Sequence, residues 1–264
     1  MTAASRFLPG LCSITFRELT VEEVVRMASA EQTSAIEWGG DVHVPAGNGA
    51  KARAVSRLCS DAGILCPSYG SYVRAGAADE RQDFAAVLDT AQELGASNIR
   101  VWAGDAASVS VDGDGRQRTT DRLRTFAESA AACGLTLSME FHRNTLTDTL
   151  ASTRDLIDRV SHPALRSYWQ PEPERTTEDW HEEIRKLGTR CSHVHVFHWL
   201  PGRVRRPLAE GEAVWRSLFP VLEHCGDRDK PRFAFLEHVM NDAPAQFAPD
   251  FRVLKALCAE HATC

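Results

Sequence analysis

The sequence predicts an α/β protein built as a single (β/α)8 TIM barrel that spans residues 1–264. Apolar, strand-like stretches alternate with helical ones in eight units of roughly 33 residues each, which matches the size of such barrels. In addition, Glu140–His142, His193–His195 and Glu237–His238 each close or follow an apolar stretch. Barrel enzymes build their sites from the carboxyl ends of the strands. The sequence therefore predicts a site at these ends that holds a metal ion.

Four strand–helix units fill the first half of the chain. The run Thr20-Val-Glu-Glu23 has the spacing of a capping box, which predicts that a helix begins there. Gly63, Gly95 and Gly134 follow helical stretches and are expected to end them, because glycine readily adopts the left-handed conformation of a helix C-cap. The strands are expected at residues 11–16, 34–38, 64–69 and 98–102, and the helices at residues 20–30, 50–62, 79–94 and 120–133.

The second half repeats this alternation of strand and helix. Gly188 ends one helical stretch, and Pro220 is expected to kink or interrupt another, because proline has no amide hydrogen to donate. A doubly wound open sheet is the alternative fold, but it needs a glycine-rich first turn, and Thr15–Leu19 contains no glycine. The strands are expected at residues 135–141, 165–169, 192–197 and 232–236, and the helices at residues 147–160, 177–187, 212–224 and 249–261.

Composition and charge argue against several classes of protein. The chain has 30 Lys and Arg residues against 36 Asp and Glu residues, and only Arg203, Arg205 and Arg206 cluster, which argues against a nucleic-acid partner. No stretch of about 18 apolar residues is present, so we expect no membrane span, and the amino terminus lacks the apolar core of a signal peptide. None of the 8 cysteines forms a CxxC pair, and most lie in apolar runs, so we expect a cytoplasmic protein with free thiols.

Four residues at the ends of consecutive predicted strands are candidate metal ligands: Glu140, Gln170, His195 and Glu237. Two carboxylates, an amide oxygen and an imidazole suit Mn²⁺, Mg²⁺ or Co²⁺, and Zn²⁺ is also compatible with them. Each residue alone has a plainer interpretation, as a solvated residue at the barrel rim or as a hydrogen-bonded interior histidine. His193 lies deeper in its strand and is expected to be structural. The joint pattern on consecutive strands favours the metal site.

The chain resembles the xylose isomerase-like barrel superfamily, and in particular its sugar phosphate isomerase/epimerase branch. The resemblance extends over nearly the whole chain. It is fairly specific to the superfamily and poorly specific to any one substrate. The stretches that carry it are residues 35–43, 100–104, 139–149, 193–195, 207–212 and 236–238.

The resemblance implies roles for single residues. The family's metal-binding glutamates on strands five and eight correspond to Glu140 and Glu237, and its ligand on strand seven corresponds to His195. The ligand on strand six is commonly Asp in the family, whereas Gln170 stands at this position. A neutral amide removes one negative charge, which leaves the ion more electrophilic and more weakly held. We expect one divalent ion, with Mn²⁺ favoured and Mg²⁺, Co²⁺ and Zn²⁺ as alternatives.

Three further residues are expected to contact the substrate. In this family the segment after strand two lines the substrate pocket, which assigns Glu37 and His43 to it. The alternative for Glu37 is a buried carboxylate that pairs with a neighbouring arginine, for example Arg100. His142 follows a presumed ligand and is expected to hydrogen-bond the substrate or a metal-bound water.

The long loop after strand seven carries three more candidates, His198, Arg205 and Arg206. They are candidates for binding a phosphate or carboxylate group of the substrate, and His198 and Arg205 are assigned to this role. A solvated loop is the plainer interpretation for each arginine. The sequence has no glycine-rich phosphate loop and no dedicated Lys/Arg clamp, so it leaves the phosphorylation state of the substrate open.

We expect an isomerase or epimerase that acts on a ketose, an inosose or another polyhydroxy carbonyl compound through an enediolate. The metal would polarise the carbonyl, while Glu140 and Glu237 would serve as base and acid. A metal-dependent lyase or dehydratase acting on a keto-sugar or keto-glycoside is the first alternative, because it needs the same base and metal. An abasic-site endonuclease would need more histidines and a basic face, whereas a non-catalytic sugar-binding barrel would need no metal. A homodimer is compatible with the sequence.

Overall fold

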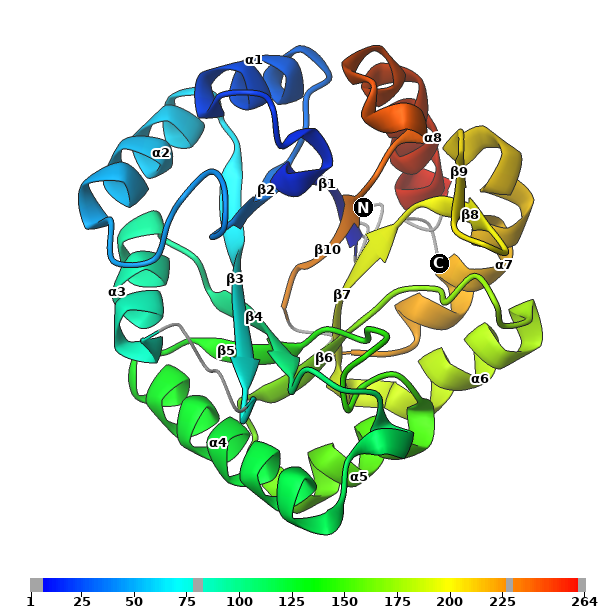
Figure 1. Ribbon diagram of the computed structural model, residues 1–264. Coiled ribbons are helices and arrows are strands. Elements are labelled where there is room, and N and C mark those ends of the chain that lie inside the picture. Colours follow the sequence, from blue (N-terminus) through cyan, green and yellow to red (C-terminus); the bar gives the residue numbers. More distant parts are fainter. Residues whose placement is uncertain (1–6, 78–82, 227–229, 261–264) are drawn as a thin grey trace. The chain divides into compact units, whose positions relative to one another are not determined.

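The computed structural model describes residues 7–77, 83–226 and 230–260. Eight strands close into a barrel in the order β1-β10-β7-β6-β5-β4-β3-β2, and eight α-helices alternate with them along the chain (Figure 1), which confirms the predicted (β/α)8 barrel. The residues group into two compact units, which are called unit 1 and unit 2 below. Unit 1 comprises Met1–Glu37, Leu58–Leu65 and Trp169–Cys264, and unit 2 comprises Trp38–Arg57 and Cys66–Tyr168.

The bounds of the strands and helices follow the predicted alternation. The barrel strands are β1 (Phe7–Cys12), β2 (Ala35–Gly39), β3 (Leu65–Ala75), β4 (Asn98–Ala103), β5 (Thr136–Met139), β6 (Leu165–Trp169), β7 (Cys191–Val196) and β10 (Arg232–Leu236). The helices are α1 (Val21–Ala30), α2 (Gly49–Asp61), α3 (Phe84–Leu94), α4 (Gly113–Ala132), α5 (Leu150–Val160), α6 (Thr177–Leu187), α7 (Glu212–Glu223) and α8 (Pro244–Glu260).

Side-chain caps explain where several helices begin. The capping box predicted at Thr20 is confirmed, since its hydroxyl accepts from the Glu23 amide while the Glu23 carboxylate accepts from the Thr20 amide. The helix predicted at residues 120–133 begins earlier, at Gly113, because the Asp112 carboxylate accepts from the Gly115 amide at 2.8 Å. In the helix predicted at residues 79–94, residues 79–82 lie outside the described residues, and α3 begins after its N-cap, Asp83.

The prediction that Pro220 interrupts a helix is wrong, because α7 continues through it to Glu223. Pro220 lies in the last part of the helix. Trp215, Leu218, Phe219 and Leu222 are buried on the side that faces the core. Tertiary packing of this apolar face therefore outweighs the one backbone hydrogen bond that proline cannot make.

The first strand lies four residues before its predicted position. The sequence predicts a strand at residues 11–16, which excludes Pro9 and Gly10. In the structure they belong to β1 (Phe7–Cys12), and Ser13–Phe16 forms a 3-10 helix. The Pro9 carbonyl accepts from the Ser34 amide at 3.2 Å, and Gly10 leaves room for a ring, since an added Cβ would lie 2.6 Å from Phe235 Cδ1. Cys12 is therefore the last residue of this strand.

Within unit 1, β10 lies between β1 and β7, and α6, α7 and α8 lie outside these strands (Figure 1). Between β7 and α7 the chain forms an antiparallel hairpin of its own, made of β8 (His198–Leu200) and β9 (Val204–Arg206). Gly202 and Arg203 take positive φ angles of 76° and 62° in its tight loop. This segment is called the β8–β9 hairpin below.

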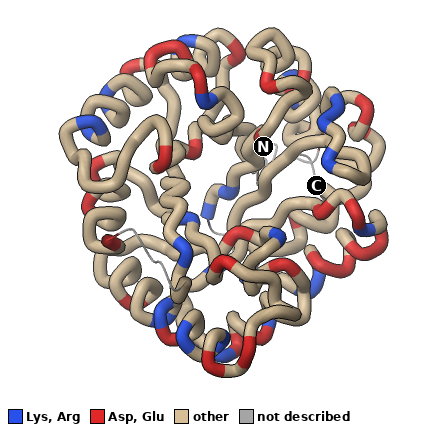
Figure 2. Tube along the Cα trace, viewed as in Figure 1, with Lys and Arg blue, Asp and Glu red and all other residues tan. Residues whose placement is uncertain are grey.

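Each unit has a buried aromatic core. In unit 1, Trp215 lies 6.1 Å from Trp169 and 6.0 Å from Phe219, measured between ring centroids. In unit 2, Phe84 and Phe126 stack with their ring centroids 3.8 Å apart. Acidic and basic residues follow one another along helices such as α4 and α6 (Figure 2). In the part of the chain that the structure describes, no helix has both the length and the hydropathy needed to cross a membrane.

Candidate functional site

Strand register in unit 1 places four chemically active side chains close together. β1 pairs with β2 so that Cys12 lies beside Glu37, and β10 pairs with β7 so that Phe235 lies beside His195. Glu237 directly follows β10 and lies two residues after Phe235, so its side chain shares the same face. All four of the reactive side chains, those of Cys12, Glu37, His195 and Glu237, are buried.

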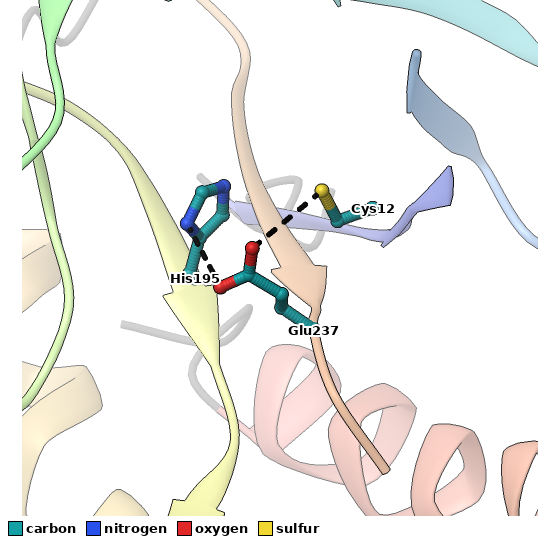
Figure 3. Close-up of side chains that lie close together, drawn as sticks. All are labelled: Cys12, His195 and Glu237. Carbon is teal, nitrogen blue, oxygen red and sulfur yellow. Dashed lines mark hydrogen bonds and ion pairs between the residues drawn. The ribbon is translucent and has the colours of Figure 1, made fainter. Parts of the chain in front are cut away.

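The imidazole of His195 lies at the centre of this cluster. Its Nε2 is 3.2 Å from Glu37 Oε1, and its Nδ1 is 3.2 Å from Glu237 Oε2. The same Nδ1 is 2.9 Å from Oε1 of Gln170, the residue that follows β6. The Cys12 thiol lies 3.4 Å from Glu37 Oε1. It also lies 3.9 Å from Glu237 Oε1, and Figure 3 shows Cys12 and His195 on either side of the Glu237 carboxylate. Three of the four predicted ligands, Gln170, His195 and Glu237, are thus brought together.

The donor atoms of the cluster suit a bound cation. Both ring nitrogens of His195 face oxygen atoms, but a neutral imidazole carries only one N–H group to donate. The other nitrogen then directs its lone pair at an oxygen, which is unfavourable unless a proton or a metal ion lies between them. Carboxylate oxygen, amide oxygen and imidazole nitrogen are all ligands of divalent ions. The residues present therefore fit the ion that the sequence predicts, and the ligand set itself stays a prediction.

His193 lies deeper in β7 and is part of the core, as expected. Its Nδ1 accepts a hydrogen bond from the Phe233 amide at 3.1 Å, so the proton of the neutral ring is on Nε2. Burial lowers the pKa of His193 to about 3, because the charged ring would lose its hydration. His193 therefore remains neutral and supports the strand that carries His195.

Glu140 lies in unit 2, where it directly follows β5 and is held by two donors. Arg100 donates to Glu140 Oε2, and the two side chains are 3% and 4% exposed. The indole Nε1 of Trp102 donates to the same oxygen at 2.6 Å. Arg100, the arginine that the sequence analysis offers as an alternative partner of Glu37, donates to Glu140, while Glu37 lies against His195 and Cys12. A guanidinium at this position favours the anionic form of Glu140.

Two threonines fix the loop that carries Glu140 and His142. The Thr147 hydroxyl donates to the Glu140 carbonyl at 2.5 Å, and the Thr145 hydroxyl donates to the His142 carbonyl at 2.6 Å. The two hydroxyls also contact each other at 2.8 Å. These bonds explain why the run from Met139 to Thr149 is rich in threonine.

The ring of His142 has a defined tautomer. Its Nδ1 lies 2.6 Å from the Arg143 carbonyl oxygen, which can only accept a hydrogen bond, so Nδ1 carries the proton. In the neutral ring the lone pair is then on Nε2. The ring stacks on Trp102 with the centroids 5.2 Å apart and the planes 30° apart. His142 is therefore oriented both by its backbone contact and by the indole that binds Glu140.

The other predicted substrate residues lie in different surroundings. His43 is buried in unit 2 and packs edge-on against Trp38 at 5.7 Å, in the loop after β2. His198 is half-buried in the β8–β9 hairpin and lines a cavity of about 250 Å³, and burial lowers its pKa. Arg205 forms an ion pair with Asp242 and lines another cavity of about 370 Å³. The substrate contacts of Glu37, His43, His142, His198 and Arg205 all stay predictions.

Cys12 is the residue of the cluster that the sequence analysis did not select. It was treated as a small hydrophobic residue, because the first strand was expected to begin at Leu11 and not to end at Cys12. Ligand atoms of Cys12, His195 and Glu237 all lie within 4.8 Å of one another. The signal that could have identified Cys12 is its position at the carboxyl end of a strand, the same signal that identified Glu140 and Glu237.

Comparison with known proteins places the chain in a family. The family model of the xylose isomerase-like TIM barrel matches residues 27–255. A 3-dehydroshikimate dehydratase from Bacillus anthracis is 39% identical over 70 residues, which cover 26% of this chain and 25% of that protein. The match therefore spans about a quarter of the length of this relative.

Solved structures share the fold over almost the whole chain. The probable 3-DHS dehydratase AsbF from Bacillus anthracis, involved in petrobactin synthesis, has a TM-score of 0.76 and 22% identity, with 94% of this chain and 98% of that chain covered. D-psicose 3-epimerase in the presence of D-fructose has a TM-score of 0.71 and 14% identity, with 97% and 100% covered. A xylose isomerase-like TIM barrel protein from Mycobacterium smegmatis in complex with magnesium has a TM-score of 0.69 and 15% identity, with 98% and 99% covered.

Proposed function

We propose that this chain, which belongs to the xylose isomerase-like TIM barrel family, is an enzyme that removes a proton from a carbon beside the carbonyl of a polyhydroxy compound. The observation that carries the proposal is the buried His195 ring, whose two nitrogens face oxygens of Glu37, Gln170 and Glu237. This donor set fits a divalent ion. The magnesium complex of a family member with the same fold supports this interpretation.

His195 and Glu237 are the residues that would hold the ion, with Gln170 as a neutral third donor. When bound, a divalent ion acts as a Lewis acid that stabilises the charge developing on the carbonyl oxygen as the proton leaves. Gln170 lowers the negative charge of the donor set in comparison with a carboxylate. Oxygen-rich donors of this kind suit Mn²⁺, with Mg²⁺, Co²⁺ and Zn²⁺ as alternatives.

His142 is the base in this proposal, in place of Glu140. Arg100 and Trp102 both donate to the Glu140 carboxylate, and hydrogen bonds to the anionic form make a carboxylate a weaker base. The His142 ring has its proton fixed on Nδ1 by the Arg143 carbonyl, so the lone pair on Nε2 is the one that accepts a proton. An imidazole has a basicity suited to this step near neutral pH.

The preferred outcome of proton removal is loss of a neighbouring hydroxyl as water, which makes the protein a dehydratase. The curated relative with 39% identity is a 3-dehydroshikimate dehydratase, and a structure covering 94% of this chain is a probable 3-DHS dehydratase. Elimination of water also needs only one base at the carbon. Glu140 is held by a buried cation, so it is poorly suited to act as a second base. The substrate class is a hydroxylated cyclic ketone of the dehydroshikimate type.

An isomerase or epimerase is the second candidate. Several solved structures with this fold are sugar epimerases, including D-psicose 3-epimerase and L-ribulose 3-epimerase. That reaction needs an acid and a base, and Glu140 and Glu237 are the residues for these roles. Both candidates begin with the same proton removal, so they differ only in the fate of the resulting enolate.

The products formed in heavy water distinguish the two candidates. The purified protein with Mn²⁺ is incubated in D₂O with 3-dehydroshikimate and, separately, with D-fructose, D-psicose and an inosose. A dehydratase forms a product lighter by one water from 3-dehydroshikimate. An epimerase instead forms a product of unchanged skeleton from a ketose, with deuterium at the carbon that lost its proton. Turnover of none of these compounds, and no exchange of their α-hydrogens, would contradict both candidates.

A further inference from the structure

The Cys12 thiol belongs to the His195 cluster by position and burial. Cys12 ends β1, is fully buried, and pairs in register with Glu37 of β2. Its Sγ lies 3.4 Å from Glu37 Oε1 and 3.9 Å from Glu237 Oε1. A buried thiol that faces carboxylates in this way differs from one packed among apolar side chains, because it lies beside groups that attract a cation.

The spacing of these donors is that of ligands around one ion. Zinc binds sulfur at about 2.3 Å and nitrogen or oxygen at about 2.0–2.2 Å, so neighbouring ligand atoms of a tetrahedral site lie roughly 3–4 Å apart. The Cys12–Glu237 distance of 3.9 Å falls in this range, and ligand atoms of Cys12, His195 and Glu237 all lie within 4.8 Å of one another. Nδ1 of His195 lies 2.9 Å from the Gln170 amide oxygen. In this inference Gln170 accepts the Nδ1 proton and orients the ring for metal binding through Nε2, so that Cys12 takes the place of Gln170 as the third donor.

We propose that Cys12 is a metal ligand, and that Cys12, His195 and Glu237 form a thiolate-containing site for a Zn²⁺-class ion. On binding, the S–H bond of Cys12 breaks, its proton leaves to solvent, and a sulfur–metal bond forms. This inference rests on the divalent ion of the proposed function and concerns which residues hold it. It assigns a role to Cys12, which the sequence analysis did not select.

A thiolate at this position would restore the charge that Gln170 lacks. The sequence predicts weak binding, because Gln170 replaces a carboxylate with a neutral amide. The Cys12 thiolate supplies one negative charge to the same cluster. Thiolate ligands favour zinc over the harder Mn²⁺ and Mg²⁺. We therefore expect this chain to prefer Zn²⁺ and Co²⁺, unlike a site made only of oxygen and imidazole ligands.

Cobalt spectroscopy and zinc X-ray absorption test this assignment directly. The full chain is stripped of metal with a chelator and titrated with Co²⁺, and the near-ultraviolet band of thiolate-to-cobalt charge transfer is recorded. X-ray absorption of the zinc-loaded wild type should show one sulfur atom at about 2.3 Å from the zinc ion. Cys12→Ser should lose the cobalt band and weaken Zn²⁺ binding by at least about tenfold. Its binding of Mn²⁺ should change much less.

Cys225→Ser is the matched control, because this thiol is also buried but donates to the Ile184 carbonyl at 3.2 Å. It should keep the cobalt band and the affinity for Zn²⁺. Cys12→Ala replaces the serine variant if the latter fails to fold, as judged by circular dichroism.

The other outcomes overturn the proposal in distinguishable ways. Binding of Co²⁺ without the band, with no sulfur near zinc, would refute the role of Cys12 and leave a metal-dependent enzyme intact. A band that persists in Cys12→Ser would assign the thiolate to another cysteine. Failure of the wild type to bind any of these ions would overturn both this inference and the metal dependence of the proposed function.

Discussion

Arg100 and Glu140 form an ion pair in unit 2 in which both side chains are almost completely buried, with exposed fractions of 3% and 4%. Strand register creates the pair: β4 and β5 align Arg100 with Ser138, and Glu140 lies two residues further along the same face. Trp102 donates a further hydrogen bond to the carboxylate. The ion pair therefore fixes both the charge and the orientation of Glu140, which the sequence predicts to be a catalytic residue.

Removal of the cation should strongly destabilise the protein. Arg100→Met leaves the Glu140 carboxylate buried without its counter-charge, and we expect the free energy of unfolding to fall by about 3–5 kcal/mol. Urea denaturation followed by circular dichroism measures this change. Arg53→Met is the control, since the Arg53–Glu93 pair is 49% and 41% exposed and should contribute less than about 1 kcal/mol. Equal losses of unfolding free energy in the two variants would show that the buried pair stabilises the fold no more than the exposed pair does.

His142→Asn should lower kcat by about 10²–10⁴-fold, because the variant has no group to accept the substrate proton. KM should change much less, since the asparagine amide can still donate to the Arg143 carbonyl. Steady-state kinetics on whichever compound the wild type turns over measures both constants. His224→Asn is a matched control, because the exposed His224 ring also places Nδ1 2.6 Å from a carbonyl, that of Pro220. Full activity of the His142 variant would exclude it as the base.

Glu140→Gln should abolish exchange of the substrate α-hydrogen with solvent deuterium, although Glu140 is not the base in the proposed mechanism. The neutral amide no longer balances the charge of Arg100, so the loop that carries His142 should lose its fixed position. Proton NMR of the substrate in D₂O measures the exchange. Exchange at the wild-type rate in this variant would remove Glu140 from the site altogether.

Asp250 should make stability depend on pH. Its buried carboxylate accepts from the Leu208 amide at 2.8 Å and the Gln246 side chain at 2.9 Å, yet burial outweighs these bonds and raises its pKa above the ordinary value of 3.8. The folded state then binds a proton more tightly than the unfolded state does. The stability that Asp250 contributes is fully present below its pKa in the unfolded state. It is lost as pH rises through its raised pKa in the folded state.

Asp250→Asn tests that dependence, because the amide oxygen can still accept from Leu208 while the charge is gone. Relative to the wild type, the variant should gain stability as pH rises from about 4 to 7, as measured by urea midpoints at several pH values. Asp250→Ala, which leaves the Leu208 amide without its acceptor, should instead lose about 1–3 kcal/mol. Parallel pH profiles for wild type and Asp250→Asn would contradict the raised pKa.

The side-chain cap of α6 should contribute measurably to stability. Thr176→Ala removes the hydroxyl that accepts from the Asp179 amide at the start of α6, and it should cost about 1 kcal/mol in thermal or urea unfolding. Thr176→Ser keeps the hydroxyl and should remain close to wild type. Thr125→Ala, within α4, should cost less, because this exposed hydroxyl donates to a carbonyl that already belongs to the helix. A loss at Thr125 equal to that at Thr176 would argue against the cap.

The alternation of strands and helices could be predicted because its signals are local. Glycine C-caps, the Thr20 capping box and apolar runs depend on neighbours a few residues away. Glu140, Gln170 and Glu237 were found for the same reason, since each directly follows a strand. The first strand was misplaced at Pro9 and Gly10, because the Phe235 ring that needs the bare Gly10 is 225 residues away along the chain.

The partners of the site residues could not be predicted, because they depend on register between strands. The pairing of Arg100 with Glu140 follows from the alignment of β4 with β5, which no local pattern encodes. The contact of Cys12 with Glu37 follows in the same way from β1 and β2. The sequence thus indicates which residue types stand at strand ends, and the register decides which of them touch.

The β8–β9 hairpin pairs its two strands with each other, His198 with Arg206 and Leu200 with Val204, and neither strand belongs to the barrel sheet. Its sequence can therefore diverge without disturbing the ladder that closes the eight-stranded ring. For protein engineers this makes residues 198–206 an exchangeable module. The hairpin can be replaced by that of a relative or randomised in a directed-evolution library. We expect such variants to fold, and they can be screened for new substrate preferences.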